Sequence, residues 1–145
     1  MKNKKIFIGI DPGQSNGFAI RAYGALQLYT LKLYELFEKI EDVLELHSVD
    51  QIQVFIENPN LWTNFKNSPD AASRLQGAGS VKGTYAHIAE YLTDRNIDFV
   101  GCRPDKTRNS YGAAKNIEVF QELTGYTKRC SEHARVAAML IAGCR

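Results

Sequence analysis

Acidic side chains follow two apolar segments of the sequence and open a third segment. One apolar run ends at Asp11 and another ends at Glu57, and each is followed within two residues by a proline. Both runs are typical of strands buried in a sheet. Glu132 and His133 follow Ser131, which is expected to cap a helix. If these four side chains converge, carboxylates and a histidine form a site for Mg²⁺ or Mn²⁺, which activates water and stabilises the leaving oxygen of a phosphodiester.

Each residue also has a simpler interpretation. Asp11 could cap the Pro-Gly turn that follows it, and Glu57 could merely end its strand. An acid such as Glu132 suits the positive end of a helix, and His133 could be an ordinary half-exposed histidine. The recurrence of acids at matching points of three separate elements favours a shared metal site.

The periodicity of apolar residues predicts an α/β protein with a mixed sheet flanked by helices. Strands are expected at residues 5–10, 17–22, 25–31, 52–56 and 97–102, with a tight turn joining the second and third. Helices are expected at residues 32–47, from 68 towards 94, at 117–125 and after Ser131. Three glycines, Gly77, Gly79 and Gly83, could divide the second helix in two. Residues 103–114 are expected to form a polar connection.

Length and composition limit the class of protein. The 145 residues are expected to form one domain, residues 1–145. No apolar run exceeds the length of a strand and no signal-peptide pattern precedes the first strand, so we expect a cytoplasmic protein without a membrane partner. The three widely spaced cysteines suit reduced thiols and show no zinc pattern. Residues 35–50 carry a net charge of −5 and residues 101–130 carry a net charge of +3. This difference indicates one face turned away from polyanions and another turned towards them. Charged runs of this kind are also often only solvated surface.

Three motifs resemble those of the RuvC family of Holliday-junction resolvases, within the RNase H-like superfamily. Residues 9–13 with Gly17 resemble the first-strand motif, Ile56 and Glu57 resemble its second acidic motif, and residues 132–138 resemble the motif of its final helix. The compact length is similar to that of phage and prophage members. The resemblance implies an RNase H-like α/β fold with a five-stranded mixed sheet. It also implies a metal-dependent endonuclease that resolves four-way DNA junctions by paired phosphodiester hydrolysis.

The same resemblance implies roles for individual residues. Catalysis and binding of Mg²⁺ or Mn²⁺ would fall to Asp11, Glu57, Glu132 and His133. Two aromatic residues occupy the loop that enters the junction in the family, although the first could equally anchor the loop: Trp62 and Phe65. Candidate phosphate contacts are Lys82, Arg103, Lys106, Arg108 and Lys115. The small residues of the segment 71–86 would let two copies pack as a homodimer on branched DNA, with no nucleotide cofactor.

One position departs from the family pattern. Val136 stands where the family has its last carboxylate, and Glu132 lies four residues earlier, about one helical turn away, so it cannot simply fill that place. The alternative is therefore a catalytically impaired protein of the same fold that binds junctions or other nucleic acids. A ribonuclease acting on RNA–DNA hybrids as a monomer is a further alternative. The first motif also resembles the phosphate hairpin of the actin and sugar-kinase superfamily, but that fold requires two such lobes.

Overall fold

The computed structural model describes residues 3–61, 71–104 and 109–144, and within them five strands form one mixed sheet. Its strand order is β3-β2-β1-β4-β5, in which β1 pairs antiparallel with β2 and parallel with β4. The two outer pairs are β2 with β3, antiparallel, and β4 with β5, parallel. The strands are β1 (Ile6–Asp11), β2 (Asn16–Ala22), β3 (Ala25–Leu31), β4 (Ile52–Glu57) and β5 (Asp98–Cys102). The predicted five-stranded mixed sheet is confirmed.

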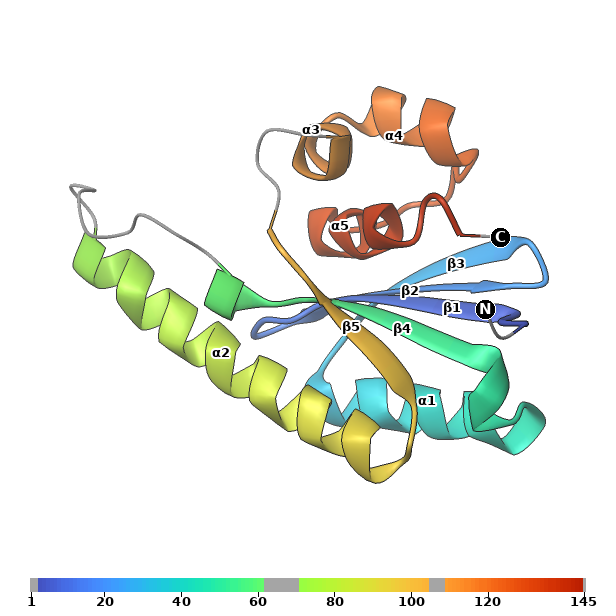
Figure 1. Ribbon diagram of the computed structural model, residues 1–145. Coiled ribbons are helices and arrows are strands. Elements are labelled where there is room, and N and C mark those ends of the chain that lie inside the picture. The colour runs from blue at the N-terminus through green and yellow to red at the C-terminus, as the bar shows by residue number, and fades with distance from the viewer. Residues whose placement is uncertain (1–2, 62–70, 105–108, 145) are drawn as a thin grey trace.

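Helices cover both faces of this sheet. One face carries α1 and α2, and the other carries α3, α4 and α5 (Figure 1). Two short 3₁₀ turns, η1 (Val49–Gln51) and η2 (Pro59–Leu61), flank β4. The helices are α1 (Leu33–Leu46), α2 (Ala71–Asp94), α3 (Asn109–Lys115), α4 (Ile117–Thr124) and α5 (Glu132–Leu140). Within the described residues, none of these helices is both long and apolar enough to cross a membrane.

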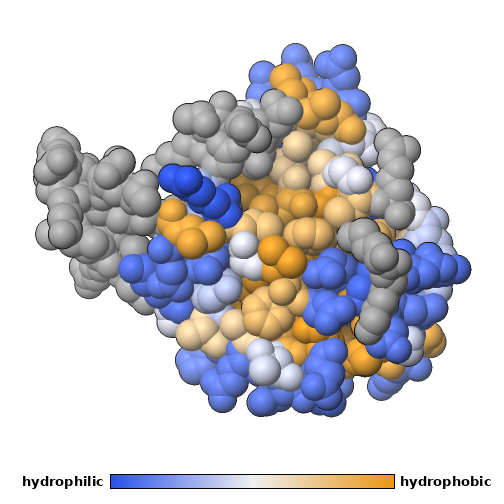
Figure 2. All heavy atoms as spheres, in the orientation of Figure 1, coloured by the Kyte–Doolittle hydropathy of each residue, from blue (hydrophilic) through white to orange (hydrophobic). Residues whose placement is uncertain are grey.

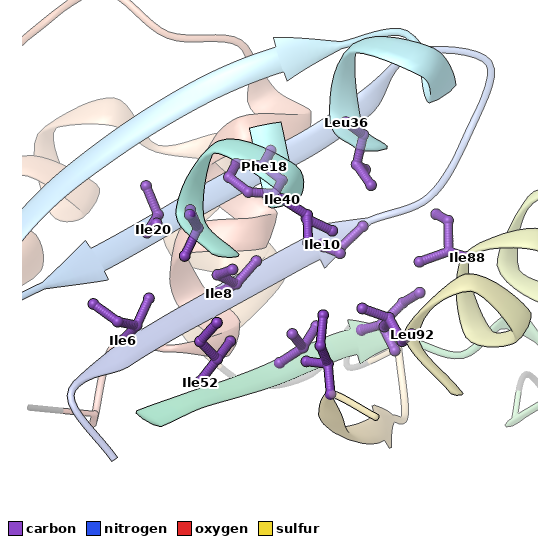
Figure 3. Close-up of a cluster of buried hydrophobic side chains, with 14 residues drawn as sticks. Ile6, Ile8, Ile10, Phe18, Ile20, Leu36, Ile40, Ile52, Ile88 and Leu92 are labelled. Carbon is purple, nitrogen blue, oxygen red and sulfur yellow. The ribbon is translucent and has the colours of Figure 1, made fainter. Parts of the chain in front are cut away.

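The larger core lies between the sheet and the helices α1 and α2. Alternate residues of β1 point into it, and Figure 3 shows Ile6, Ile8 and Ile10 in a row beside β2, β4 and the two helices. From α1 come Leu36 and Ile40, and from α2 come Ile88 and Leu92, all fully buried. Because successive side chains of a strand point to opposite faces, the other residues of β1, including Asp11, face α5. This alternation places Asp11 on the side opposite the larger core.

A smaller core holds α5 against the other face of the sheet. Ala134, Ala137, Ala138 and Ile141 pack with residues of β2, β3 and α4. The sheet offers no side chain at two of the positions beneath α5. A Cβ atom at Gly9 would lie 2.0 Å from the backbone oxygen of Ala137, and one at Gly17 would lie 1.9 Å from that of His133. The backbone of α5 therefore rests directly on β1 and β2.

One prediction about secondary structure differs from the structure, and one open alternative is resolved. Of the one or two helices expected from residue 68 towards residue 94, the structure has a single helix, α2, that continues through its glycines. The predicted polar connection at residues 103–114 contains α3, whose Ala113 and Ala114 are buried. Arg135 of α5 ties α3 in place, because its Nε donates to the backbone oxygen of Ala114 at 2.5 Å. Packing against α5 thus stabilises a short helix that local sequence does not favour.

Apolar side chains also reach the solvent on the face that carries α5. Figure 2 shows them over the centre of this view, across α5 and β5, and again over α4. The exposed large apolar residues of this region include Val100 on β5 and Ile117, Val119 and Leu123 on α4.

Candidate active site

Asp11 and Glu57 lie side by side at the C-terminal edge of the parallel strands β1 and β4. Ile10 is the register partner of Ile56, so the residues that follow these two end their strands together. Adjacent strands are about 4.8 Å apart. Asp11 is 7% exposed and Glu57 is 5% exposed. The condition on which the sequence analysis placed these two acids together, that their strands are parallel neighbours, is met.

The two acids belong to a row of residues that crosses the whole sheet. Thr30 pairs with Gly17, Gly17 pairs with Asp11, and Glu57 pairs with Cys102. All five side-chain positions lie on the face that carries α5. The first turn of α5 covers one end of the row, because the hydroxyl oxygens of Ser131 and Thr30 are 2.5 Å apart. Ser131 also caps α5 by accepting a hydrogen bond from the backbone nitrogen of Ala134.

His133 makes a direct contact with Asp11. Its Nδ1 lies 2.9 Å from Oδ2 of Asp11, and its ring is mostly exposed while the carboxyl group is not. Burial raises the pKa of the Asp11 carboxyl, and the hydrogen bond from His133 opposes that shift. The hydrogen bond to Asp11 raises the pKa of His133 above 6.5. The doubly protonated, positively charged form of the His133 ring is therefore favoured beside Asp11 more than it is in a free histidine.

Glu132 and Val136 take different positions on α5. Glu132 is exposed, and its negative charge raises the pKa of both Asp11 and His133. Val136 follows His133 by three residues, so it lies on the same side of the helix, and it is 2% exposed. The structure thus places an apolar, buried side chain where the resemblance leads one to expect a carboxylate.

Asp11 and Glu57 carry the type of oxygen donor that a hard divalent cation prefers. Across the described residues, no group of three or more histidine, cysteine, aspartate or glutamate side chains is arranged to hold a metal ion. Mg²⁺ is commonly held by only one or two carboxylates, with water and substrate phosphates completing its octahedron. Asp11 and Glu57 supply hard oxygen donors of this kind at one edge of the sheet. Their chemistry fits Mg²⁺ or Mn²⁺ whose coordination the substrate completes.

Only some of the predicted DNA contacts fall within the described part of the chain. Those with exposed side chains are Lys82 on α2, Arg103 directly after β5 and Lys115 at the end of α3. The remaining ones lie outside the described residues: Trp62, Phe65, Lys106 and Arg108. Arg103 is nearest in sequence to the acid row, because it follows Cys102.

Thr30 was not singled out from the sequence, and Ser131 and Gly9 were recognised only as a helix cap and as part of a motif, without the contacts that they make. Thr30 and Ser131 fix the start of α5 over the row, and Gly9 lets α5 approach β1. An isolated glycine inside a strand is a known signal of close backbone approach, so Gly9 could have been found in this way. Nothing in the sequence around Thr30 marks its contact, because Ser131 is 101 residues away.

Comparison with known proteins shows that the chain has a fold seen before. No model of a protein family matches the sequence, and no curated protein matches it. Among solved structures, the chain is similar to T. thermophilus RuvC in complex with a Holliday junction substrate, with a TM-score of 0.56. The alignment covers 95% of this chain and 92% of that chain at 15% identity. The chain has a RuvC-like fold. At this identity the similarity establishes the fold alone.

Proposed function

We propose that this chain is a metal-dependent, structure-selective endonuclease that resolves four-way DNA junctions by paired phosphodiester hydrolysis. The observation that carries the proposal is that Asp11 and Glu57 end adjacent parallel strands at one edge of the sheet, with His133 in contact with Asp11. The similarity to a RuvC chain whose structure contains a Holliday junction supports branched DNA as the substrate.

The acids would hold the metal and the histidine would orient one of them. Asp11 and Glu57 are the proposed ligands of Mg²⁺ or Mn²⁺, which when bound supplies activation of the attacking water and neutralises charge on the leaving oxygen. His133 holds Oδ2 of Asp11 at 2.9 Å and so fixes the direction of that carboxylate. Glu132, exposed one residue earlier, is proposed to contribute to the same site from its edge.

The DNA would lie across the edge of the sheet that carries the acids. Lys82, Arg103 and Lys115 are the proposed phosphate contacts within the described residues. To these the sequence adds Lys106 and Arg108, and the aromatic pair Trp62 and Phe65. A homodimer is proposed to form through α2, on which Gly83 and Ala86 are exposed and would allow close approach of a second helix. Two active sites would then face two strands of one junction.

A second candidate function is favoured by Val136. An apolar side chain that is 2% exposed supplies no metal ligand, and the described residues contain no cluster of three potential ligands. A protein of this fold that binds junctions without cutting them would show the same arrangement. The two functions differ in one measurable property, the hydrolysis of bound DNA.

The deciding experiment compares junction binding with junction cleavage. A labelled four-way junction and a linear duplex of the same length are incubated with the native chain in Mg²⁺ or Mn²⁺. We expect cleavage of the junction in preference to the duplex, and none by Asp11→Asn. Junction binding without cleavage in either metal would support the second candidate. A monomer that cuts RNA–DNA hybrids as well as junctions would contradict resolution.

A matched pair of substitutions then tests position 136. Val136→Asp adds a carboxylate beside His133, and Val136→Asn adds a side chain of similar shape without the charge. If the missing carboxylate limits cleavage, only Val136→Asp increases the rate. Both place a polar group in a buried position, which costs roughly 1–3 kcal/mol of stability, so folding of each is measured first.

A further inference from the structure

A pocket on the α1 side of the sheet is distant from the acid row. It has a volume of about 170 Å³, and Ile6, Ile20 and Ala22 line it from the sheet, with Val43 and Leu46 from α1. Figure 3 shows Ile6 and Ile20 on neighbouring strands on this face. Ile6 begins β1 and Asp11 ends it, so the two are about 17 Å apart along the strand and point to opposite faces. A molecule in this pocket would leave the acid row uncovered.

The mouth of the pocket exposes large apolar side chains. Leu46 is 80% exposed, and Tyr23, which is 66% exposed, lies against His47 with ring centroids 5.6 Å apart. His47 itself lines the pocket. A dry cavity of about 150 Å³ is enough to bind benzene, so this pocket can admit one leucine or aromatic side chain. Such a pocket beside exposed apolar groups is typical of the anchor site of a protein–protein contact.

Acidic side chains border the pocket along α1. Glu38, Asp42 and Glu45 are exposed and are spaced four and three residues apart, so they form one stripe along the helix. Asp42 lines the pocket. Lys39 also lines the pocket, and its Nζ lies 4.1 Å from the centroid of the Tyr29 ring. The stripe disfavours DNA and anionic lipid, and it favours a cationic partner.

We propose that this pocket docks a basic segment of a partner protein. One apolar side chain of that segment enters the pocket, and its lysines or arginines lie along Glu38, Asp42 and Glu45. A second copy of this chain fits less well, because a two-fold contact brings the same acidic stripe of both copies together. The inference does not depend on the nuclease function, since it uses none of the residues of the acid row.

Short peptides test the two requirements separately. The probes are Lys-Lys-Leu-Lys-Lys, its alanine analogue Lys-Lys-Ala-Lys-Lys, and Glu-Glu-Leu-Glu-Glu, each titrated into ¹⁵N-labelled protein. We expect the first to shift the amide signals of Ala22, Val43 and Leu46 and to leave that of Ala137 unchanged. The alanine analogue lacks three carbons of the leucine side chain that enters the pocket, so it should bind at least about tenfold more weakly than the first peptide. Equal binding of the alanine analogue would overturn the proposal, as would equal binding of the acidic peptide.

Variants of the protein locate the contact. Ala22→Leu fills the pocket from the sheet, and the double substitution Asp42→Lys with Glu45→Lys reverses the charge of two residues of the stripe. Each change should weaken binding of the first peptide at least about fivefold. The matched control, Glu118→Lys with Glu122→Lys, reverses two exposed acids on α4 and should leave binding unchanged. Leu46→Asn replaces an exposed apolar lining residue if Ala22→Leu fails to fold. Unchanged binding by the pocket variants would refute the proposal, as would a change of oligomeric state in Ala22→Leu, which would identify a second copy as the occupant.

Discussion

Gly17→Ala is the substitution that most directly tests how α5 is positioned. The added Cβ would lie 1.9 Å from the backbone oxygen of His133 and 2.3 Å from its carbonyl carbon. The distance from the added Cβ to that oxygen is about 1.5 Å shorter than the 3.4 Å at which ordinary van der Waals contact begins. Both neighbours are backbone atoms of packed elements, so neither can rotate away. The start of α5 must move, and we expect a loss of about 3 kcal/mol in the free energy of unfolding.

Chemical denaturation of the variant and of a matched control measures this effect. Gly112→Ala adds the same methyl group within α3, where no atom beyond its chain neighbours and the nearby backbone of its own helix lies within 4 Å, and should stabilise the protein by up to about 1 kcal/mol. The shift of α5 should also separate His133 from Asp11, which the NMR signals of the histidine ring can report. If Gly17→Ala were as stable as the native chain, α5 could not lie against β2 as described.

Three further predictions concern Asp11 and the residues that surround it. Asp11→Asn removes a carboxyl group whose pKa is raised by burial. At a pH above that raised pKa, the variant should therefore be at least as stable as the native chain in urea denaturation, and it should no longer cleave junctions. Because the folded-state pKa of His133 is raised, its pairing with Asp11 stabilises the fold fully below pH 6.5. This stabilisation is lost as the pH rises through the folded-state pKa of His133. His133→Asn should flatten this dependence in denaturation curves recorded from pH 6.5 upwards, and an unchanged slope would argue against the pair. Ser131→Ala should cost about 1 kcal/mol in thermal unfolding, whereas Ser131→Asp, which retains a capping oxygen, should cost less.

The sheet and the pairing of its acids could be predicted because both depend on local patterns. An apolar run ending at an acid occurs twice, at Asp11 and at Glu57, and parallel neighbours place their ends together. The direct hydrogen bond from His133 to Asp11 could not be predicted, because it depends on the side-chain conformation and on the exact height of α5 above the sheet. That height is determined by Gly9 and Gly17, whose contacts are made with residues more than a hundred positions away.

Helices that depend on tertiary contacts were the least predictable elements. The segment of α3 contains Gly112 and polar residues, and its stability comes from burial of Ala113 and Ala114 beside α5. In α2, each glycine costs roughly 1 kcal/mol relative to alanine, yet the helix is continuous. The packing of Ile88 and Leu92 into the larger core stabilises its C-terminal half. Intrinsic propensity alone underestimates both helices.

The 122-residue separation of Asp11 and His133 has a consequence for biosynthesis. At the usual rate of about 5–20 residues per second, a ribosome adds His133 roughly 6–24 s after Asp11. The hairpin of β1 and β2 needs only neighbouring residues and can form early, whereas the contact with His133 must await α5. The nascent chain therefore carries its first acid for many seconds before the pair can close, and any activity that requires the pair begins only after nearly all of the described elements have been made.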